Sequence, residues 1–357
     1  MRLIFALPGF HRYDRGAEVA LLAVAGELAR TGDDVTVVGS GPGTDARAYR
    51  YLQIPAVRRE RFEKFPTVPP FRSETAWEDA SFAINLVRKI DLHGYDASVT
   101  CSFPFSHWAL RRLGLKGPAS IFVTQNGDWP AFSDRAEYRL FSCEGLVCTN
   151  PDYFSRNADR WNCRLIPNGV DLALFKPGAA DRDRLGLPAD RPVILMVSAL
   201  ITSKRVIDGI RAVAELPDAS LIVAGDGPLR QQVTELAEEL LPNRFRLVSL
   251  PAEEMPALYR SADVFLHLSQ LESFGNVFLE AWASGLPIVA HRSDRLRWIL
   301  GERHYLCDTT KPADLHDALC AALSARGSAA PEGIERFSWG SVSAQYREFV
   351  LETLTRR

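Results

Sequence analysis

The chain has few of the features that mark a membrane-spanning, disulfide-bonded or nucleic-acid-binding protein. Its 357 residues contain no uninterrupted apolar window of about 18 residues, so we expect no membrane span. The formal net charge of −2 offers no general attraction for nucleic acid. None of the six cysteines forms a C-x-x-C pair, which argues against a zinc site and favours reduced, buried thiols in a cytoplasmic protein.

Signatures of targeting and of common cofactors are also missing. The apolar run 1–7 ends at Pro8-Gly9 and is too short for a secretory signal followed by a cleavage site. A dinucleotide-binding enzyme needs G-x-G-x-x-G directly after its first strand, and this chain reads Pro8-Gly9-Phe10-His11 there. No G-x-x-x-x-G-K-[ST] loop occurs. These absences exclude a dinucleotide-dependent oxidoreductase and a P-loop NTPase, and we expect no cofactor and no metal.

Short apolar runs alternate with helical patterns along the whole chain, which is typical of parallel α/β proteins. The expected strands are residues 3–7, 34–38, 97–100, 120–124, 145–148, 164–166, 193–197, 220–224, 245–248, 264–268 and 287–290. The helix expected over 18–29 carries an apolar face of Val19, Leu22, Ala23 and Leu28. The pattern predicts doubly wound sheets, whose ligands collect at the carboxyl ends of the strands.

The alternation of strands and helices is interrupted once, at Pro177-Gly178 and the polar stretch 179–191. A chain of this length favours two domains over one. We therefore expect a first domain over 1–176 and a second over 177–338, followed by a C-terminal helix within 339–357.

The segment between Leu268 and Ala290 is the most informative about function. Glu272 and Glu280 bracket a small, turn-prone stretch that follows a strand and opens a helix. A helix that starts at a strand tip presents free backbone N–H groups and its positive dipole end, which suit a phosphate. Glu272 in the loop can reach a sugar, and Glu280 one turn into the helix can accept hydrogen bonds from a ribose. This arrangement favours a nucleotide-sugar as ligand.

The two glutamates resemble the Glu-x7-Glu motif of the retaining glycosyltransferases of the GT-B family called family 4. Further matches with that family are found in Gly16-Ala17-Glu18, Asn168-Gly169-Val170-Asp171, Lys204 and Gly225-Asp226-Gly227. Together they extend the resemblance over nearly the whole chain. It implies two Rossmann-like domains facing a cleft, the first for the acceptor and the second for the nucleotide-sugar, with the C-terminal helix crossing back onto the first.

By this resemblance, the enzyme moves a hexosyl group from a UDP- or GDP-linked sugar to an acceptor hydroxyl, with retention and without a metal. The acceptor class is a small molecule, a glycan or a lipid-linked sugar. A nucleotide-sugar epimerase and a non-catalytic nucleotide-sugar-binding protein are the alternatives. The residues expected to take part in catalysis are Lys204, Glu272, Asp128 and Asn126. Those expected to bind the donor are Gly16, Arg205, Gly225, Asp226, Ser273, Phe274, Gly275, Asn276, Val277 and Glu280.

Three of these expectations depart from the family pattern or have simpler alternatives. Ala199 stands where the family often has an arginine, so one expected positive charge is either missing or supplied by Arg205. Asn126 and Asp128 replace the usual histidine, and an Asx-turn that only shapes the loop is the alternative to contact with sugar and acceptor. His107 is the best remaining imidazole, although a lone histidine in apolar surroundings is more often packed than catalytic.

The segment 47–65 mixes arginines and one lysine with Tyr51, Phe62 and Phe65. A solvated surface loop with a short helix is the simpler interpretation. The other is an acceptor-binding or membrane-surface element, at the inner face of a membrane, because cations interleaved with aromatic rings suit anionic head groups.

Overall fold

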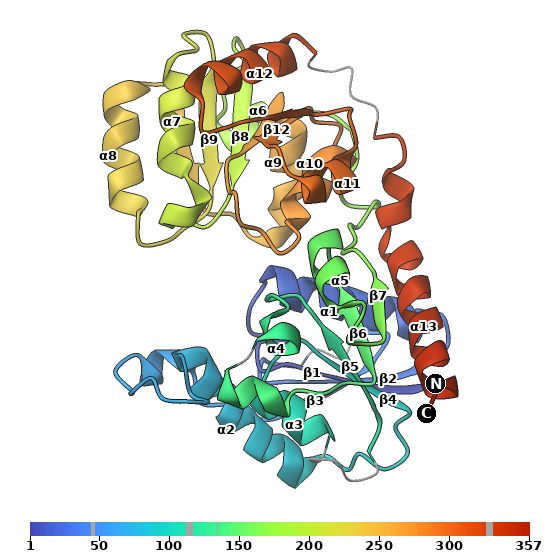
Figure 1. The fold of residues 1–357 in the computed structure, drawn as a ribbon. Coiled ribbons are helices and arrows are strands. Elements are labelled where there is room, and N and C mark those ends of the chain that lie inside the picture. The colour runs from blue at the N-terminus through green and yellow to red at the C-terminus, as the bar shows by residue number, and fades with distance from the viewer. Residues whose placement is uncertain (44–46, 112–116, 134, 326–330) are drawn as a thin grey trace. The chain divides into compact units, whose positions relative to one another are not determined.

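The computed structural model describes residues 1–43, 47–111, 117–133, 135–325 and 331–357. It divides into two compact units (Figure 1). The first comprises Met1–Gly169 together with Trp339–Arg357, and the second comprises Val170–Ser338. Each unit is a parallel sheet with helices between most of its successive strands, as the alternating sequence pattern predicts.

The first unit is built on a sheet of seven parallel strands in the order β3-β2-β1-β4-β5-β6-β7 within the described residues. Its strands are β1 (Arg2–Ala6), β2 (Asp34–Gly39), β3 (Arg50–Gln53), β4 (Ala97–Thr100), β5 (Ala119–Val123), β6 (Gly145–Cys148) and β7 (Cys163–Leu165). Its helices are α1 (Gly16–Arg30), η1 (Arg59–Phe62), α2 (Glu74–Lys89), α3 (Phe105–Arg111), α4 (Trp129–Phe132), η3 (Ala136–Leu140), α5 (Pro151–Asn157) and α13 (Trp339–Thr355). The strand order reverses between β1 and β4, so the ends of these strands mark the expected ligand edge.

The second unit is built on a six-stranded parallel sheet in the order β10-β9-β8-β11-β12-β13. Its strands are β8 (Val193–Val197), β9 (Ser220–Ala224), β10 (Phe245–Val248), β11 (Val264–His267), β12 (Ile288–His291) and β13 (Tyr305–Cys307). Its helices are α6 (Arg182–Leu185), η4 (Thr202–Lys204), α7 (Val206–Ala214), α8 (Arg230–Leu240), η5 (Ala252–Glu254), α9 (Met255–Ser261), α10 (Asn276–Ala283), α11 (Asp294–Leu300), α12 (Pro312–Ser324) and η6 (Ile334–Phe337). Here the order reverses between β8 and β11, and both strands carry predicted site residues at their ends.

The C-terminal helix α13 packs on α1 and completes the core of the first unit, as predicted. Val342, Tyr346 and Phe349 of α13 are buried in the same cluster as the side chains of β1 and β2. Arg347 also donates to Asp33 at 3.0 Å. The buried face of α1 differs from the predicted one, because α1 packs against α13 as well as against the sheet. Val19 is 42% exposed, and the buried apolar side chains are Ala20, Leu21, Val24, Ala25 and Leu28.

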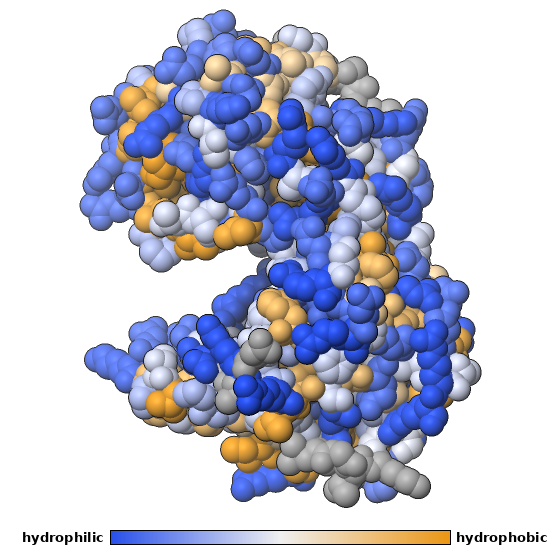
Figure 2. Space-filling model, viewed as in Figure 1, coloured by the Kyte–Doolittle hydropathy of each residue, from blue (hydrophilic) through white to orange (hydrophobic). Residues whose placement is uncertain are grey.

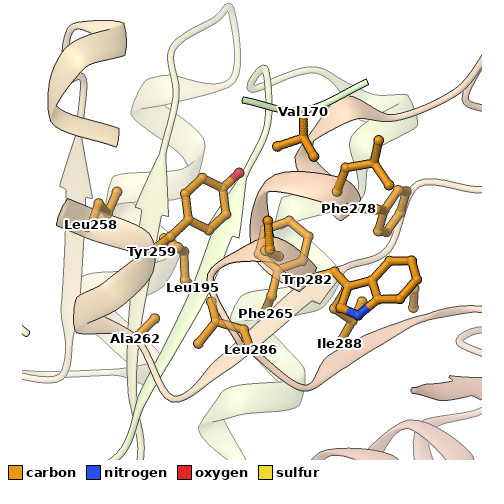
Figure 3. Close-up of a cluster of buried hydrophobic side chains, with 14 of the residues drawn as sticks. Val170, Leu195, Leu258, Tyr259, Ala262, Phe265, Phe278, Trp282, Leu286 and Ile288 are labelled. Carbon is orange, nitrogen blue, oxygen red and sulfur yellow. The ribbon is translucent and has the colours of Figure 1, made fainter. Parts of the chain in front are cut away.

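The segment 170–176, which the sequence assigned to the first domain, packs with the second unit. The Val170 amide donates to Phe337 O at 2.8 Å, and the Phe175 ring meets the ring of Tyr259 edge-on at 5.7 Å between centroids. Val170 lies in one buried cluster with Tyr259, Phe265 and Trp282 (Figure 3). The unit boundary therefore follows Gly169, ahead of the Pro177-Gly178 turn.

The basic and aromatic segment 47–65 is more ordered than either sequence interpretation required. It contains β3 at the sheet edge and the short helix η1. Phe62 and Phe65 pack around Trp77 of α2, with centroid distances of 5.8 and 5.2 Å, yet Phe65 stays 46% exposed. In Figure 2 the visible faces of both units are mostly hydrophilic, with apolar residues in small separate patches. None of the described helices is long and apolar enough to cross a membrane.

The cysteines of the chain are all reduced, as expected. Cys101, Cys143, Cys148, Cys163, Cys307 and Cys320 are free thiols, and each is buried or half-buried. Burial raises the pKa of the Cys307 thiol to about 11, so this group stays protonated near neutral pH. The cysteines contribute to the packing of the two units.

Candidate functional site

The loop that joins β11 to α10 forms the centre of the candidate site in the second unit. β11 is fully buried and ends at His267, and α10 begins at Asn276. Gly275 precedes the helix with φ +92°, a conformation that side chains other than glycine rarely adopt. The glycine thus lets the chain turn sharply, so that the first turn of α10 starts at the carboxyl edge of the sheet. This placement is the one that the sequence predicts for a phosphate-binding helix start.

Replacing Gly275 with alanine is expected to destabilise the second unit by about 1–3 kcal/mol, because the new methyl would meet the Phe278 ring at 2.7 Å. Gly333→Ala is the matched control. Gly333 also has a positive φ, of +81°, but nothing lies within 4 Å of its added Cβ. Chemical denaturation of both variants should show the larger loss at Gly275. Equal losses of stability would mean that the positive φ alone, and not the contact with Phe278, requires glycine at position 275.

Glu272 is held by two basic side chains from different parts of the second unit. Its Oε1 accepts a hydrogen bond from the Lys204 ammonium and lies 3.2 Å from Nε2 of His267. Burial by itself would raise the pKa of Glu272, but the hydrogen bonds and charges of His267 and Lys204 outweigh it and lower the pKa to about 2. Arg295 of α11 donates to the main-chain oxygen of Glu272. The carboxylate is therefore ionised and fixed, with Lys204 in contact with it as predicted for one site.

Glu280 lies one turn into α10 and is half-buried. Its Oε2 accepts a hydrogen bond of 2.8 Å from the hydroxyl of Tyr259, a side chain with no exposed surface. Burial raises the pKa of Glu280, and the Tyr259 hydrogen bond opposes that rise. The partner that a buried carboxylate requires is therefore present within the protein.

Arg205 follows Lys204 but uses its guanidinium differently from the expectation. It adopts φ +55° and donates to Asp208 at 2.7 Å, to the hydroxyl and carbonyl of Thr309 at 2.9 Å, and to Leu268 O at 3.3 Å. These bonds tie the η4–α7 turn to the chain after β11 and after β13. Arg205 therefore fixes the turn that carries Lys204.

The turn after β9 lies against the chain that leads to Lys204. A Cβ at Gly225 would stand 1.9 Å from Ser198 O, so only glycine allows this approach. The Leu200 amide donates to Asp226 O at 2.9 Å. The Asp226 carboxylate accepts from the Gly227 amide at 2.8 Å and from Arg230 at 3.3 Å, and both hydrogen bonds lower its pKa. Gly225 and Asp226 thus shape the edge of the candidate site.

The remaining donor-binding predictions concern the loop between the two glutamates. Phe274 is 2% exposed and packs in the core against Trp298, so it can offer a ligand only its backbone amide. Ser273, Asn276 and Val277 are half-buried at the helix start. The structure brings these residues together with Glu272 on one short loop, as the spacing predicts.

In the first unit the predicted site residues are either exposed or buried. Gly16 opens α1 and is exposed, without a side-chain cap on the helix. Asn126 is exposed after β5, and its carbonyl accepts from the Trp129 indole at 3.2 Å. Asp128 is buried and engaged, with Arg156 at 2.9 Å and Asn157 at 2.8 Å. Both hydrogen bonds go to Oδ2 of the carboxylate and join α4 to α5.

The imidazole of His107 is packed in the core, as is usual for a lone histidine in apolar surroundings. It has no exposed surface, stacks on Phe141 at 5.1 Å and donates from Nε2 to Ser142 O at 2.9 Å. Burial lowers the pKa of His107 to about 4. His107 is therefore a neutral core residue.

Comparison with known proteins identifies the family. Residues 15–174 match the family described as Glycosyltransferase Family 4, and residues 179–332 match the one described as Glycosyl transferases group 1. A D-inositol 3-phosphate glycosyltransferase of Corynebacterium efficiens is 34% identical over 95% of this chain and 91% of its own length. The chain belongs to glycosyltransferase family 4. Other curated family 4 relatives are matched over about half of their length, 54% and 56% in two of them.

Solved structures confirm the GT-B fold of this family 4 chain. Sucrose-phosphate synthase from Thermosynechococcus elongatus superposes over 100% of both chains with a TM-score of 0.79 at 21% identity. HepE from Anabaena, solved with UDP and glucose, covers 99% of this chain and 100% of its own with a TM-score of 0.74 at 18% identity. The chain is thus a member of a family of transferase enzymes, with the two-sheet architecture that the sequence predicts.

Three residues of this family 4 site were not predicted from the sequence. His267 and Tyr259 contact the two glutamates directly, and Arg295 fixes the Glu272 main chain. The position of His267 at the end of an apolar strand was a sequence signal that could have placed it in the site. Tyr259 and Arg295 lie on helices without a motif, and nothing in their local sequence connects them with the loop.

Proposed function

We propose that the chain is a retaining glycosyltransferase that moves a hexosyl group from a UDP- or GDP-linked sugar to an acceptor hydroxyl without a metal. The observation that carries this proposal is the contact of Lys204 with Glu272 beside the start of α10. A cation, an ionised carboxylate and a helix start at one strand edge can serve the diphosphate and the sugar of one donor. The UDP in the structure of HepE supports uridine.

The bond between sugar C1 and the diphosphate oxygen breaks, and the acceptor oxygen bonds to C1 on the same face. Negative charge grows on the leaving diphosphate, where Lys204 and the α10 amides stabilise it. The leaving phosphate takes the acceptor's proton, so no strong general base is required. This fits the engagement of Asp128 with Arg156 and the burial of His107.

The acceptor is assigned to the first unit, near Gly16 and Asn126, and belongs to the class of small molecules, glycans or lipid-linked sugars. The relative from Corynebacterium efficiens is named for an inositol phosphate, which favours a polyol acceptor. A cytoplasmic location, with contact to an inner membrane surface through segment 47–65, remains part of this proposal. The exposed Phe65 beside the exposed Arg61 and Lys64 supports that contact.

A thermal-shift panel of UDP, GDP and ADP, followed by the nucleotide-sugars of the base that binds, tests the proposed function. One diphosphate should raise the midpoint, since a ligand at about 100 times its Kd stabilises by about 2.7 kcal/mol. The matching donor should then be hydrolysed slowly to the free diphosphate. An epimerase would return a rearranged nucleotide-sugar without free diphosphate, and a binding protein would show the shift alone. No shift with any nucleotide would contradict the proposal.

A further inference from the structure

The two oxygens of Glu272 are used unequally. Lys204 and His267 both approach Oε1. Within the described part of the chain no group donates a hydrogen bond to Oε2, and the side chain keeps 14% of its surface exposed. Oε2 is therefore the oxygen that can accept from a sugar hydroxyl, and its direction depends on what holds Oε1.

The ring of His267 is fixed in both position and orientation. The ring is 3% exposed and stacks on Phe278, with centroids 4.9 Å apart and planes at 21°. Nδ1 accepts the backbone N–H of Ser269 at 3.3 Å, so this nitrogen carries no hydrogen. The ring proton is then on Nε2, which donates to Glu272 at 3.2 Å.

The Lys204 side chain can move away from Glu272 more easily than the stacked His267 ring can. Its ammonium sits on a flexible, partly exposed stem and is the cation assigned to the diphosphate in the proposed function. An ammonium drawn to a diphosphate weakens its bond to Glu272, whereas the stacked His267 ring cannot follow. In the donor complex the hydrogen bond from His267 would then be the one that keeps the Glu272 carboxylate oriented.

We propose that His267 is a positioning residue that orients Glu272 toward the donor sugar, and so sets the affinity for the sugar moiety but not for the nucleotide. This inference rests on the proposed function of the same site. His267 would thus help the site to distinguish a nucleotide-sugar from its free diphosphate, although the His267 side chain contacts Glu272 and not the ligand. His267→Gln places an amide N–H where Nε2 stands, whereas His267→Asn is too short to reach Glu272 but retains a polar group near Ser269.

Isothermal titration of the whole chain with UDP and UDP-glucose, and with GDP and GDP-mannose, separates these roles. His267→Asn should bind the nucleotide-sugar about 5- to 10-fold more weakly, as expected for one lost hydrogen bond, with the diphosphate affinity unchanged within about twofold. His267→Gln should bind both ligands like the wild type. His304→Asn is the control for loss of a buried imidazole, since no described group bonds either ring nitrogen of His304.

Equal weakening of diphosphate and nucleotide-sugar in His267→Asn, or no weakening of either, would overturn the inference while leaving the proposed function intact. A wild type that binds none of the four ligands would instead refute the proposed function, and the inference with it. Nitrogen NMR of the His267 ring in the wild type gives a further test that does not depend on the folding of a variant. It should show the proton on Nε2, and a proton on Nδ1 would contradict the geometry on which the inference depends.

Discussion

Lys204→Ala is expected to lower the turnover of the glycosyl transfer by about 100- to 1,000-fold, the usual cost of removing one group that stabilises charge in the transition state. The negative charge on the leaving diphosphate is greatest in the transition state, so the loss should fall on kcat at least as much as on KM. Steady-state kinetics with the donor that the nucleotide panel identifies measure both constants.

Lys311→Ala is the matched control for Lys204→Ala. Lys311 is a lysine of the same unit, 66% exposed and paired loosely with Asp308 at 3.7 Å, so its loss should leave the kinetics unchanged. If Lys204→Ala raised KM alone and kept kcat, the ammonium would bind the ground state only. Its assigned part in stabilising the leaving group would then be wrong.

Glu280→Ala should weaken the binding of both the nucleoside diphosphate and the nucleotide-sugar by about 1–3 kcal/mol, the range for losing hydrogen bonds at a buried acceptor. Both ligands contain the ribose, so both should be affected equally, in contrast to the His267 variants. Isothermal titration with the two ligands gives the comparison directly.

A simpler role for Glu280 is to satisfy the buried hydroxyl of Tyr259. Tyr259→Phe separates the two roles. If Glu280 serves Tyr259 alone, the double variant should recover both stability and nucleotide affinity. If Glu280 binds ribose, the double variant should recover stability only, because the hydroxyl no longer lacks a partner while the ribose still does.

The central strands could be predicted from the sequence almost to the residue, because each is an apolar run buried on both faces. The inner strands β4, β6, β8 and β9 have the predicted bounds. The edge strand β10 also has them, although none of its residues is fully buried. The edge strands β3 and β13 were missed, since β3 has no buried residue and β13 has only three residues. An edge strand is paired on one side only and needs no apolar pattern. The buried face of α1 was predicted wrongly because α13, at the opposite end of the chain, packs against it.

The candidate site could be predicted as a set of residues but not as a set of contacts. The spacing of Glu272 and Glu280 and the small residues between them indicated the loop, and its helix start was found where expected. The contact of Lys204 with Glu272 joins positions far apart in the chain, which local patterns do not encode. For the same reason the sequence did not indicate that Arg156 and Asn157 donate hydrogen bonds to Oδ2 of Asp128.

A crystal structure of the whole chain with an intact nucleotide-sugar tests the central claim most directly. The account predicts the diphosphate between Lys204 and the first turn of α10, a sugar hydroxyl on Glu272, and a ribose hydroxyl on Glu280. A donor bound elsewhere, with this loop empty and both glutamates keeping only their partners Lys204 and Tyr259, would contradict it.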